Sequence, residues 1–258
     1  MHIFKKSMLA TSLAALAMAA YLPAAQAATL GGTFTTDNGS FVYLSTSTTS
    51  AGTLIGQSNQ WESSFSLTST SLVPGQTYYL HVEAINNGGP AGFIGQFNLG
   101  GSGFQFSNGS QTLLTNTTNW SGGYNDAYGG TFDKTTNTLT ATPQSWVAVN
   151  GPVASAGSNG TQPWAGSTDV SVYNVSANAQ WIWAADSQSL APGGNPGNSS
   201  ATNGPCQTCT IDLTSGPITV ISAASSVPAP GGISIAALLL AALSGVALLR
   251  RKKPDASC

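Results

Sequence analysis

Short runs of alternating polar and hydrophobic residues dominate residues 28–222. A period of two is typical of a strand that buries one face, and this region has no sustained 3.6-residue period of an amphipathic helix. The clearest run covers residues 77–85, after the turn at Pro74 and Gly75, and predicts the strongest strand of the chain. The residues predicted to share its buried face are Tyr78, Leu80, Val82 and Ala84.

Shorter runs between turns rich in glycine, asparagine and proline predict further strands. They cover residues 40–44, 64–68, 91–99, 138–141, 169–173, 180–184, 210–213 and 218–221. Three polar, glycine-rich segments, 116–130, 151–167 and 191–204, predict loops, the last of them flexible. Many short strands without helices predict an all-β fold, an antiparallel β-sandwich or jelly roll.

The first 27 residues predict a signal peptide. A short basic start precedes an apolar run at residues 8–22, which is short for a membrane span. Ala25 and Ala27 then supply the small-x-small pattern of a cleavage site, so the mature chain is expected to begin at Ala28.

The C-terminal end divides into a linker at 223–232, an uncharged run at 233–249 and a basic tail at 250–258. The 17 residues of the uncharged run would span roughly 25 Å as a helix, near the lower limit for a transmembrane helix. The basic tail should stay on the cytoplasmic side because moving it across the membrane is costly. Residues 28–222 are therefore expected outside the cytoplasm.

Charge is distributed unevenly along the chain. The net charge is −2, but six of the seven basic residues lie in the two terminal segments. Between Ala28 and Ser226 the single basic residue is Lys134, against eight acidic residues, which gives this region a net charge of −7. Such a surface repels phosphate backbones, so nucleic acid is not an expected partner.

Residues for catalysis are scarce. His81 is the one histidine of the region, and no nucleophile-elbow sequence accompanies it, so we expect a surface or cross-strand residue beside Tyr79 and Glu83. Glycoside hydrolysis needs two carboxylates about 5–10 Å apart in a cleft. Nothing in the sequence brings the two glutamates, Glu62 and Glu83, together. We therefore expect that this protein is not an enzyme.

No cofactor is expected, with a structural calcium ion as an open alternative. Asp37-Asn38-Gly39 and Asn125-Asp126 supply oxygen ligands of the type that calcium uses. Neither has the repeated spacing of an EF-hand loop. Asx turns explain both sequences equally well.

Two cysteines, Cys206 and Cys209, form a single C-x-x-C sequence. In an oxidising compartment they could form a small local disulfide, and free thiols are the alternative. One such pair without a second pair or nearby histidines is weak support for zinc.

Aromatic residues carry the best binding hypothesis. Flat aromatic faces with a few placed polar groups commonly hold sugars. The segment 119–128 and the following predicted loop concentrate such groups. The candidate carbohydrate-binding residues are Trp120, Tyr124, Asn125, Asp126 and Trp164. The alternative is that these side chains pack their loops onto the sandwich.

The other tryptophans differ in their expected roles. Trp181 and Trp183 lie two residues apart in a predicted strand, so they share one face and favour the core. Trp61 and Trp146 fit either the core or a binding surface.

Three features follow one another at the C-terminal end. They are Val227, Pro228, Ala229 and Pro230, then the run 233–249, then Arg250, Arg251, Lys252 and Lys253. Together they resemble the PEP-CTERM sorting signal of Gram-negative, biofilm- and floc-forming bacteria, with Ala229 where that family usually has a glutamate. The resemblance implies processing by exosortase, a membrane protease-transpeptidase, from an inner-membrane-anchored precursor to the cell surface or exopolysaccharide matrix.

Several segments of the preceding domain also follow a family pattern. They are residues 37–44, 52–61, 72–78, 86–95 and 179–183. This pattern resembles the galactose-binding-domain-like jelly rolls that are often attached to such tails. The resemblance implies a jelly-roll fold and says little about a ligand.

We therefore expect an exported, non-catalytic surface or extracellular-matrix protein that associates with polysaccharide. Its expected partners are an exosortase-type peptidase, extracellular polysaccharide and, before processing, the membrane through the C-terminal helix. The alternative is a structural or adhesive surface protein that acts by protein–protein contact without a sugar ligand.

Overall fold

The computed structural model describes residues 28–87, 91–125, 131–133, 135–140, 146, 149–161, 170–185 and 208–221. All regular elements in these residues are β-strands, and no helix among them is long and apolar enough to cross a membrane. The predicted cleavage residues Ala25 and Ala27, the motif at 227–230, the run at 233–249 and the basic tail lie outside the described residues. The predicted all-β, antiparallel fold class is confirmed.

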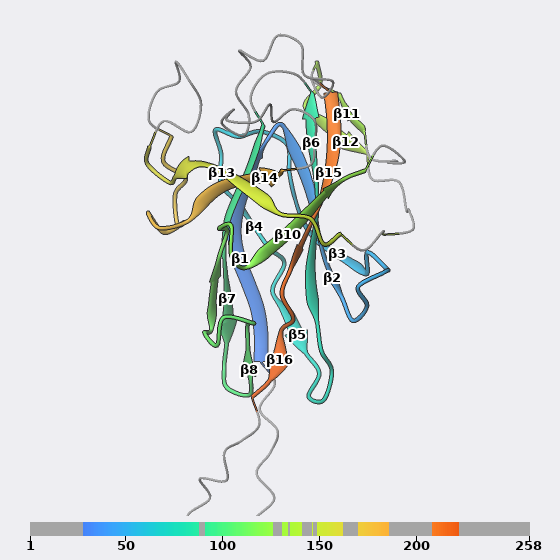
Figure 1. Cartoon of the computed structure of the whole chain (residues 1–258), viewed down its shortest axis with the longest axis vertical. Helices are drawn as coiled ribbons and strands as arrows, with labels where there is room; N and C mark the ends of the chain where they lie inside the picture. Colours follow the sequence, from blue (N-terminus) through green and yellow to red (C-terminus); the bar gives the residue numbers. More distant parts are fainter. Residues whose placement is uncertain are drawn as a thin grey trace, which may run out of the picture. The chain divides into compact units, whose positions relative to one another are not determined.

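Two antiparallel sheets make up most of the described fold (Figure 1). The seven-stranded sheet has the order β13 (Val153–Ser158), β14 (Gln180–Ala184), β7 (Gly92–Gly100), β1 (Ala28–Asp37) and β4 (Phe65–Ser66), with β5 (Thr70–Leu72) paired to β1 and β9 (Thr112–Leu114) paired to β7. The five-stranded sheet has the order β10 (Trp120–Tyr124), β15 (Thr208–Ser215), β6 (Tyr79–Asn87), β2 (Gly39–Ser45) and β3 (Thr53–Ser58). Two small ribbons pair β11 (Thr131–Asp133) with β12 (Thr138–Thr140) and β8 (Phe104–Gln105) with β16 (Thr219–Val220).

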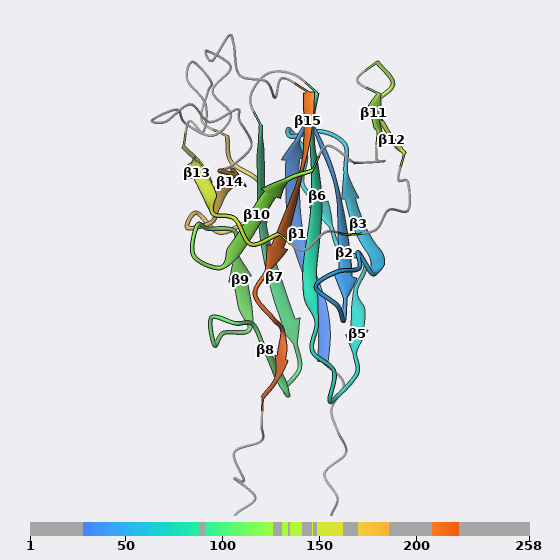
Figure 2. The ribbon, with the colours of Figure 1, turned by 45° about the vertical axis from the view of Figure 1, so that its right-hand side comes forward.

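One long antiparallel ribbon connects the two sheets. A single residue, Asn38, separates β1 from β2, yet the two strands belong to different sheets. The consecutive strands β6 and β7 are likewise divided between the two sheets, because β7 pairs with β1 and β6 pairs with β2. Asn38 fixes the crossing: its backbone N–H donates to the Ile85 carbonyl at 2.9 Å, and its side-chain oxygen accepts from the Asn87 N–H at 2.6 Å. The sheets are thereby held as adjacent layers (Figure 2).

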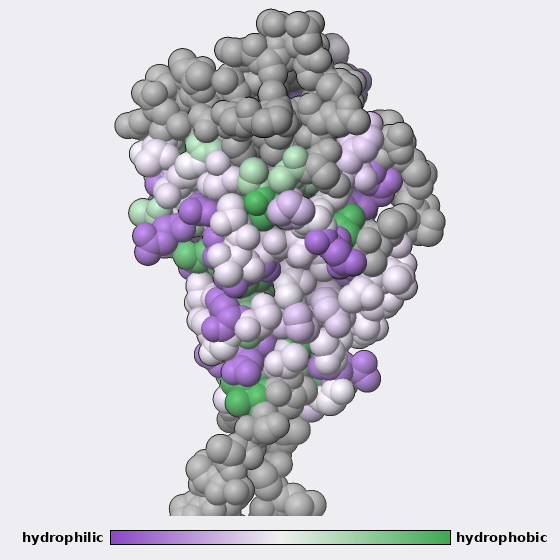
Figure 3. Space-filling view, in the orientation of Figure 1, coloured by the Kyte–Doolittle hydropathy of each residue, from purple (hydrophilic) through white to green (hydrophobic). Residues whose placement is uncertain are grey.

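The main hydrophobic core lies between the two sheets. Phe34 of β1, Val82 of β6, Phe93 of β7 and Trp183 of β14 are fully buried within it. Burial of each such side chain stabilises the fold by roughly 1.5–3 kcal/mol. On the face drawn in Figure 3, the described hydrophobic residues occur as small separate groups among polar ones.

A second hydrophobic cluster lies outside this core. It combines Ile94, Ala156, Val170, Val172, Val175, Ala179 and Trp181, with Trp61 and Leu114 packed against it. A third cluster of Phe41, Tyr43 and Ile85 is covered by Phe132 and Leu139 of the β11–β12 ribbon. Both outer clusters bury residues that face away from the main core.

The hydrophobic pattern predicted several elements well. The run 77–85 corresponds to β6, and all four residues predicted for its buried face belong to the main core. Trp181 and Trp183 are both buried as predicted, but Trp183 lies in the main core and Trp181 in the second cluster. The run 180–184 is β14, and 91–99 is β7 within one residue.

Three predictions were wrong. The predicted loops 116–130 and 151–167 contain the strands β10 and β13. The predicted strand at 169–173 is an isolated bridge at Val170 followed by a turn. The backbone N–H and carbonyl of Val172 are bound by the Asn159 side chain, as described below, and so do not form a ladder.

Candidate functional site

The structure contains a surface pocket of about 550 Å³ between two segments that are distant in sequence. We call it the Trp61–Tyr173 pocket. One wall follows β3 and the other precedes β14. Its lining residues are Trp61, Glu62, Ser63, Ser64, Val170, Ser171, Val172 and Tyr173. The volume falls within the range of about 300–1,000 Å³ that is usual for small-molecule sites.

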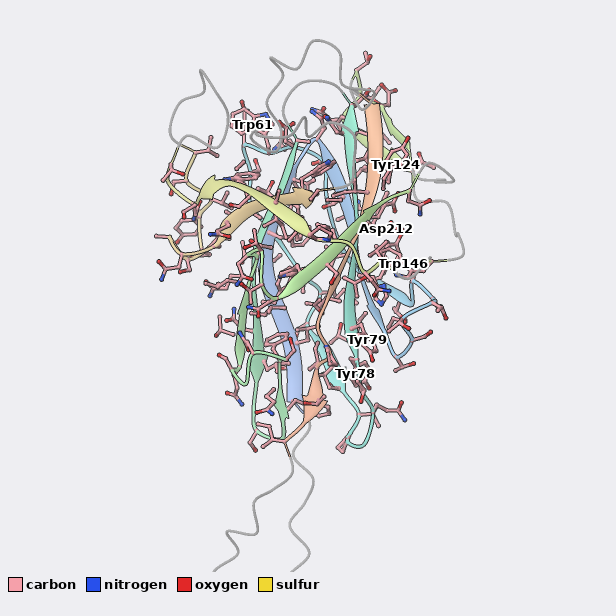
Figure 4. All side chains as sticks on the ribbon, viewed as in Figure 1. Trp61, Tyr78, Tyr79, Tyr124, Trp146 and Asp212 are labelled. Atoms are coloured by element: carbon pink, nitrogen blue, oxygen red, sulfur yellow. The ribbon has the colours of Figure 1, made fainter. Side chains whose placement is uncertain are left out.

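The first wall is a turn held by hydrogen bonds and packing. The Thr35 hydroxyl of β1 donates to the Gln60 carbonyl at 2.7 Å, and the Gln60 side-chain amide donates to the Ser63 hydroxyl at 2.5 Å. Trp61 is half-buried because it packs against the second hydrophobic cluster while also lining the pocket. Figure 4 shows Trp61 at the end of the sandwich opposite Tyr78.

The second wall is held by Asn159, a buried residue after β13. Its side-chain amide donates to the carbonyls of Val172 at 3.1 Å and Val175 at 2.8 Å, and its oxygen accepts from the Val172 N–H at 2.7 Å. Val170 and Val172 turn inward to the second cluster. These contacts leave Ser171 and Tyr173 exposed on the pocket side.

The pocket combines the group types that bind a polar ring. Tyr173 is 76% exposed and offers an aromatic face next to the edge of the buried cluster. Glu62 is exposed and supplies a carboxylate, while three serines supply hydroxyls that both donate and accept. The walls are preorganised by buried contacts, which reduces the entropy lost on binding.

Of the sequence-predicted binding residues, the three that the structure describes, Trp120, Tyr124 and Asn125, do not line this pocket. Trp120 is a core residue: it is 4% exposed, its ring lies 5.6 Å from that of Phe97, and its indole N–H donates to the Leu114 carbonyl at 3.1 Å. Trp120 is therefore not available for contact with a ligand. Tyr124 is 47% exposed and lies away from Trp61 (Figure 4).

The other predicted residues have different positions. The Asn125 side-chain amide donates to an Asp212 carboxyl oxygen at 2.7 Å. Asp126, Trp164 and Cys206 lie outside the described residues, and Cys209 is described only as a residue of β15. From the sequence, Trp61 fitted either the core or a binding surface, and Tyr173 lay in a predicted strand.

A second group of ionisable residues lies buried on the outer face of the five-stranded sheet. Glu83 on β6 is directly opposite Asp212 on β15, and His81 is two residues along β6 on the same face. All three side chains are 0% exposed. The Tyr43 hydroxyl donates to Glu83 at 3.4 Å. Trp146 lies edge-on to His81, with 4.3 Å between ring centroids.

Burial changes the proton affinity of two of these groups. It raises the pKa of Asp212 to about 7, and the Asn125 hydrogen bond only partly offsets this. Burial also lowers the pKa of His81 to about 4, against a smaller opposite effect of the Ser47 backbone. Near neutral pH His81 is therefore an uncharged interior residue. The prediction of a surface position for it is wrong, and the alternative of a cross-strand neighbour is correct, since Tyr43 and Thr214 face it.

The described residues provide no cluster of metal ligands that would support the calcium hypothesis. Among the described residues, no group of three or more histidine, cysteine or acidic side chains could hold a metal ion. The Asp37 carboxylate accepts a hydrogen bond from the side-chain amide of the neighbouring Asn38 at 2.8 Å.

Comparison with protein-family models, with curated proteins and with solved structures finds no match.

Proposed function

We propose that this chain is an exported, non-catalytic surface or matrix protein that binds carbohydrate through the Trp61–Tyr173 pocket. The observation that carries the proposal is the pocket lining, in which two aromatic side chains, a carboxylate and three hydroxyls converge at the surface. Aromatic rings pack on the C–H faces of a sugar, and hydroxyls and carboxylates pair with its hydroxyl groups.

The make-up of the pocket supports binding rather than glycoside hydrolysis. Hydrolysis uses two carboxyl groups on either side of the scissile bond, whereas Glu62 is the one acidic residue in the described lining. The buried pair Glu83 and Asp212 has no exposed surface and belongs to a different face.

The proposal also includes export of the chain and its sorting to the cell surface. Strand β1 begins at Ala28, so cleavage after Ala27 would leave its pairing with β5 and β7 intact. The long ribbon β1–β2 with β6–β7, which crosses both sheets, supports a jelly roll as the finer fold. The tail would then be processed by an exosortase-type peptidase, with delivery to the cell surface or matrix of a Gram-negative bacterium.

The test is retention of the full-length protein, in a detergent without a sugar headgroup, on a panel of immobilised polysaccharides. We expect Tyr173→Ala to weaken retention at least tenfold, the loss expected when an aromatic contact of about 1.4 kcal/mol or more is removed. Tyr124→Ala is the matched control, because Tyr124 is also exposed but lies elsewhere. Retention of wild type on no polysaccharide, together with capture of a protein from the host surface, would favour the adhesive alternative.

A further inference from the structure

We propose that the Trp61–Tyr173 pocket selects a sugar that carries a free, protonated amino group, as in a de-N-acetylated hexosamine polymer. This inference rests on the proposed carbohydrate-binding function and adds the chemical class of the ligand. It follows from the charges and rings that face the pocket.

The charge of the pocket has one sign. Glu62 is the single charged residue in the described lining, and its side chain is exposed at the mouth. The region 28–226 carries eight acidic residues and one basic residue. A uronate or a sulfated sugar would therefore meet a like charge in the pocket, whereas an ammonium group would be attracted.

The aromatic side chains favour the same charge. The face of an indole or phenol ring carries negative charge density and attracts a cation. Trp61 and Tyr173 place such rings beside Glu62 in one pocket. An ammonium group on a sugar in this pocket is thus attracted by a carboxylate and by the rings, while the exposed hydroxyls of Ser64 and Ser171 remain available for the sugar hydroxyl groups.

An acetylated amine loses both attractions because the amide is uncharged. Exposed ion pairs and exposed cation–π contacts are each weak. We therefore expect the amine-bearing oligomer to bind roughly three- to tenfold more tightly than its N-acetylated counterpart of the same length. Raising the salt concentration should reduce this ratio, since exposed charges are screened.

Calorimetric titration of the full-length protein with glucosamine, N-acetylglucosamine and glucuronate oligomers tests the inference. The pH should be mildly acidic, so that the sugar amine is protonated. Glu62→Gln removes the carboxylate and keeps the rings, so it should lower the ratio between the first two oligomers at least twofold while binding of the N-acetylated oligomer changes little. Asp133→Asn is the control, because it removes one exposed negative charge from the β11–β12 ribbon and should leave the ratio unchanged.

The outcomes distinguish failure of the amino-sugar inference from failure of the proposed carbohydrate binding. Equal binding of amine-bearing and acetylated oligomers, or tightest binding of the glucuronate oligomer, would overturn the amino-sugar inference and leave carbohydrate binding standing. An amine preference that is undiminished in Glu62→Gln would also overturn it. Binding of none of the three oligomers, and of no polysaccharide in the retention panel, would overturn both.

Discussion

Replacing Asp212 by asparagine should change how the stability of the domain depends on pH. The Asp212 carboxyl is 0% exposed, and its pKa in the folded protein is about 7, above the ordinary 3.8. The folded state therefore binds this proton more tightly than the unfolded state does. The stabilising effect is complete below about pH 3.8 and is lost as pH rises to about 7. The total loss is about 4 kcal/mol as an upper bound, at 1.36 kcal/mol per pH unit.

His81 has the opposite effect on the pH dependence of the free energy of unfolding. Its pKa falls from 6.5 to about 4 on folding, so its contribution is complete above pH 6.5 and is lost as pH falls towards 4, by about 3 kcal/mol at most. In wild type the two slopes nearly cancel between pH 4 and 6.5. Asp212→Asn keeps the shape of the protonated carboxyl and removes one slope, so the free energy of unfolding of the variant should rise with pH over this range.

Urea unfolding of wild type and Asp212→Asn at intervals between pH 4 and 8 measures both curves. The gain of the variant over wild type should grow by about 4 kcal/mol from the acidic to the neutral end, as an upper bound. Asp133→Asn is the matched control, because Asp133 is an exposed acid and its curve should follow wild type over this range. Parallel curves for Asp212→Asn and wild type would refute the assignment of a proton to the buried carboxyl.

Two further substitutions test the pocket wall and the core. Asn159→Ala removes three hydrogen bonds to the wall that contains Tyr173, so it should lower the free energy of unfolding by roughly 2–4 kcal/mol and weaken polysaccharide retention, measured by urea unfolding and affinity chromatography. Trp120→Phe removes the indole hydrogen bond to Leu114 and should cost about 1–2 kcal/mol while retention stays at the wild-type level; a large loss of retention would restore Trp120 as a ligand contact.

Local pattern was enough to predict the strands that alternate. β6 has one face in the main core, so its apolar residues recur at every second position, and the sequence shows this directly. The same rule failed for β10, whose centre is glycine. A Cβ at Gly122 would lie 3.0 Å from side-chain carbons of Leu213 and Val153, so this glycine permits close packing between the sheets and does not mark a loop.

The candidate site could not be predicted in the same way. Trp61 and Tyr173 are far apart in sequence, and the side chain of Asn159 positions the second wall by binding the backbone of Val172. Val170 and Val172 do alternate with polar residues, but their side chains pack into the second cluster from a turn and not from a strand. Glu83 and Asp212 face each other because of the strand register, which spacing does not reveal for two residues that are 129 positions apart.

The most direct test of the central claim is a nitrogen–hydrogen correlation spectrum of the six tryptophan indoles during titration with the best-retained saccharide. Trp61 lines the pocket, whereas Trp120, Trp181 and Trp183 are buried and do not line it. The pocket assignment predicts that the Trp61 signal moves most with saccharide concentration, and that Tyr173→Ala shifts this change to at least tenfold higher concentration. Movement of another indole signal while Trp61 remains unchanged would contradict it.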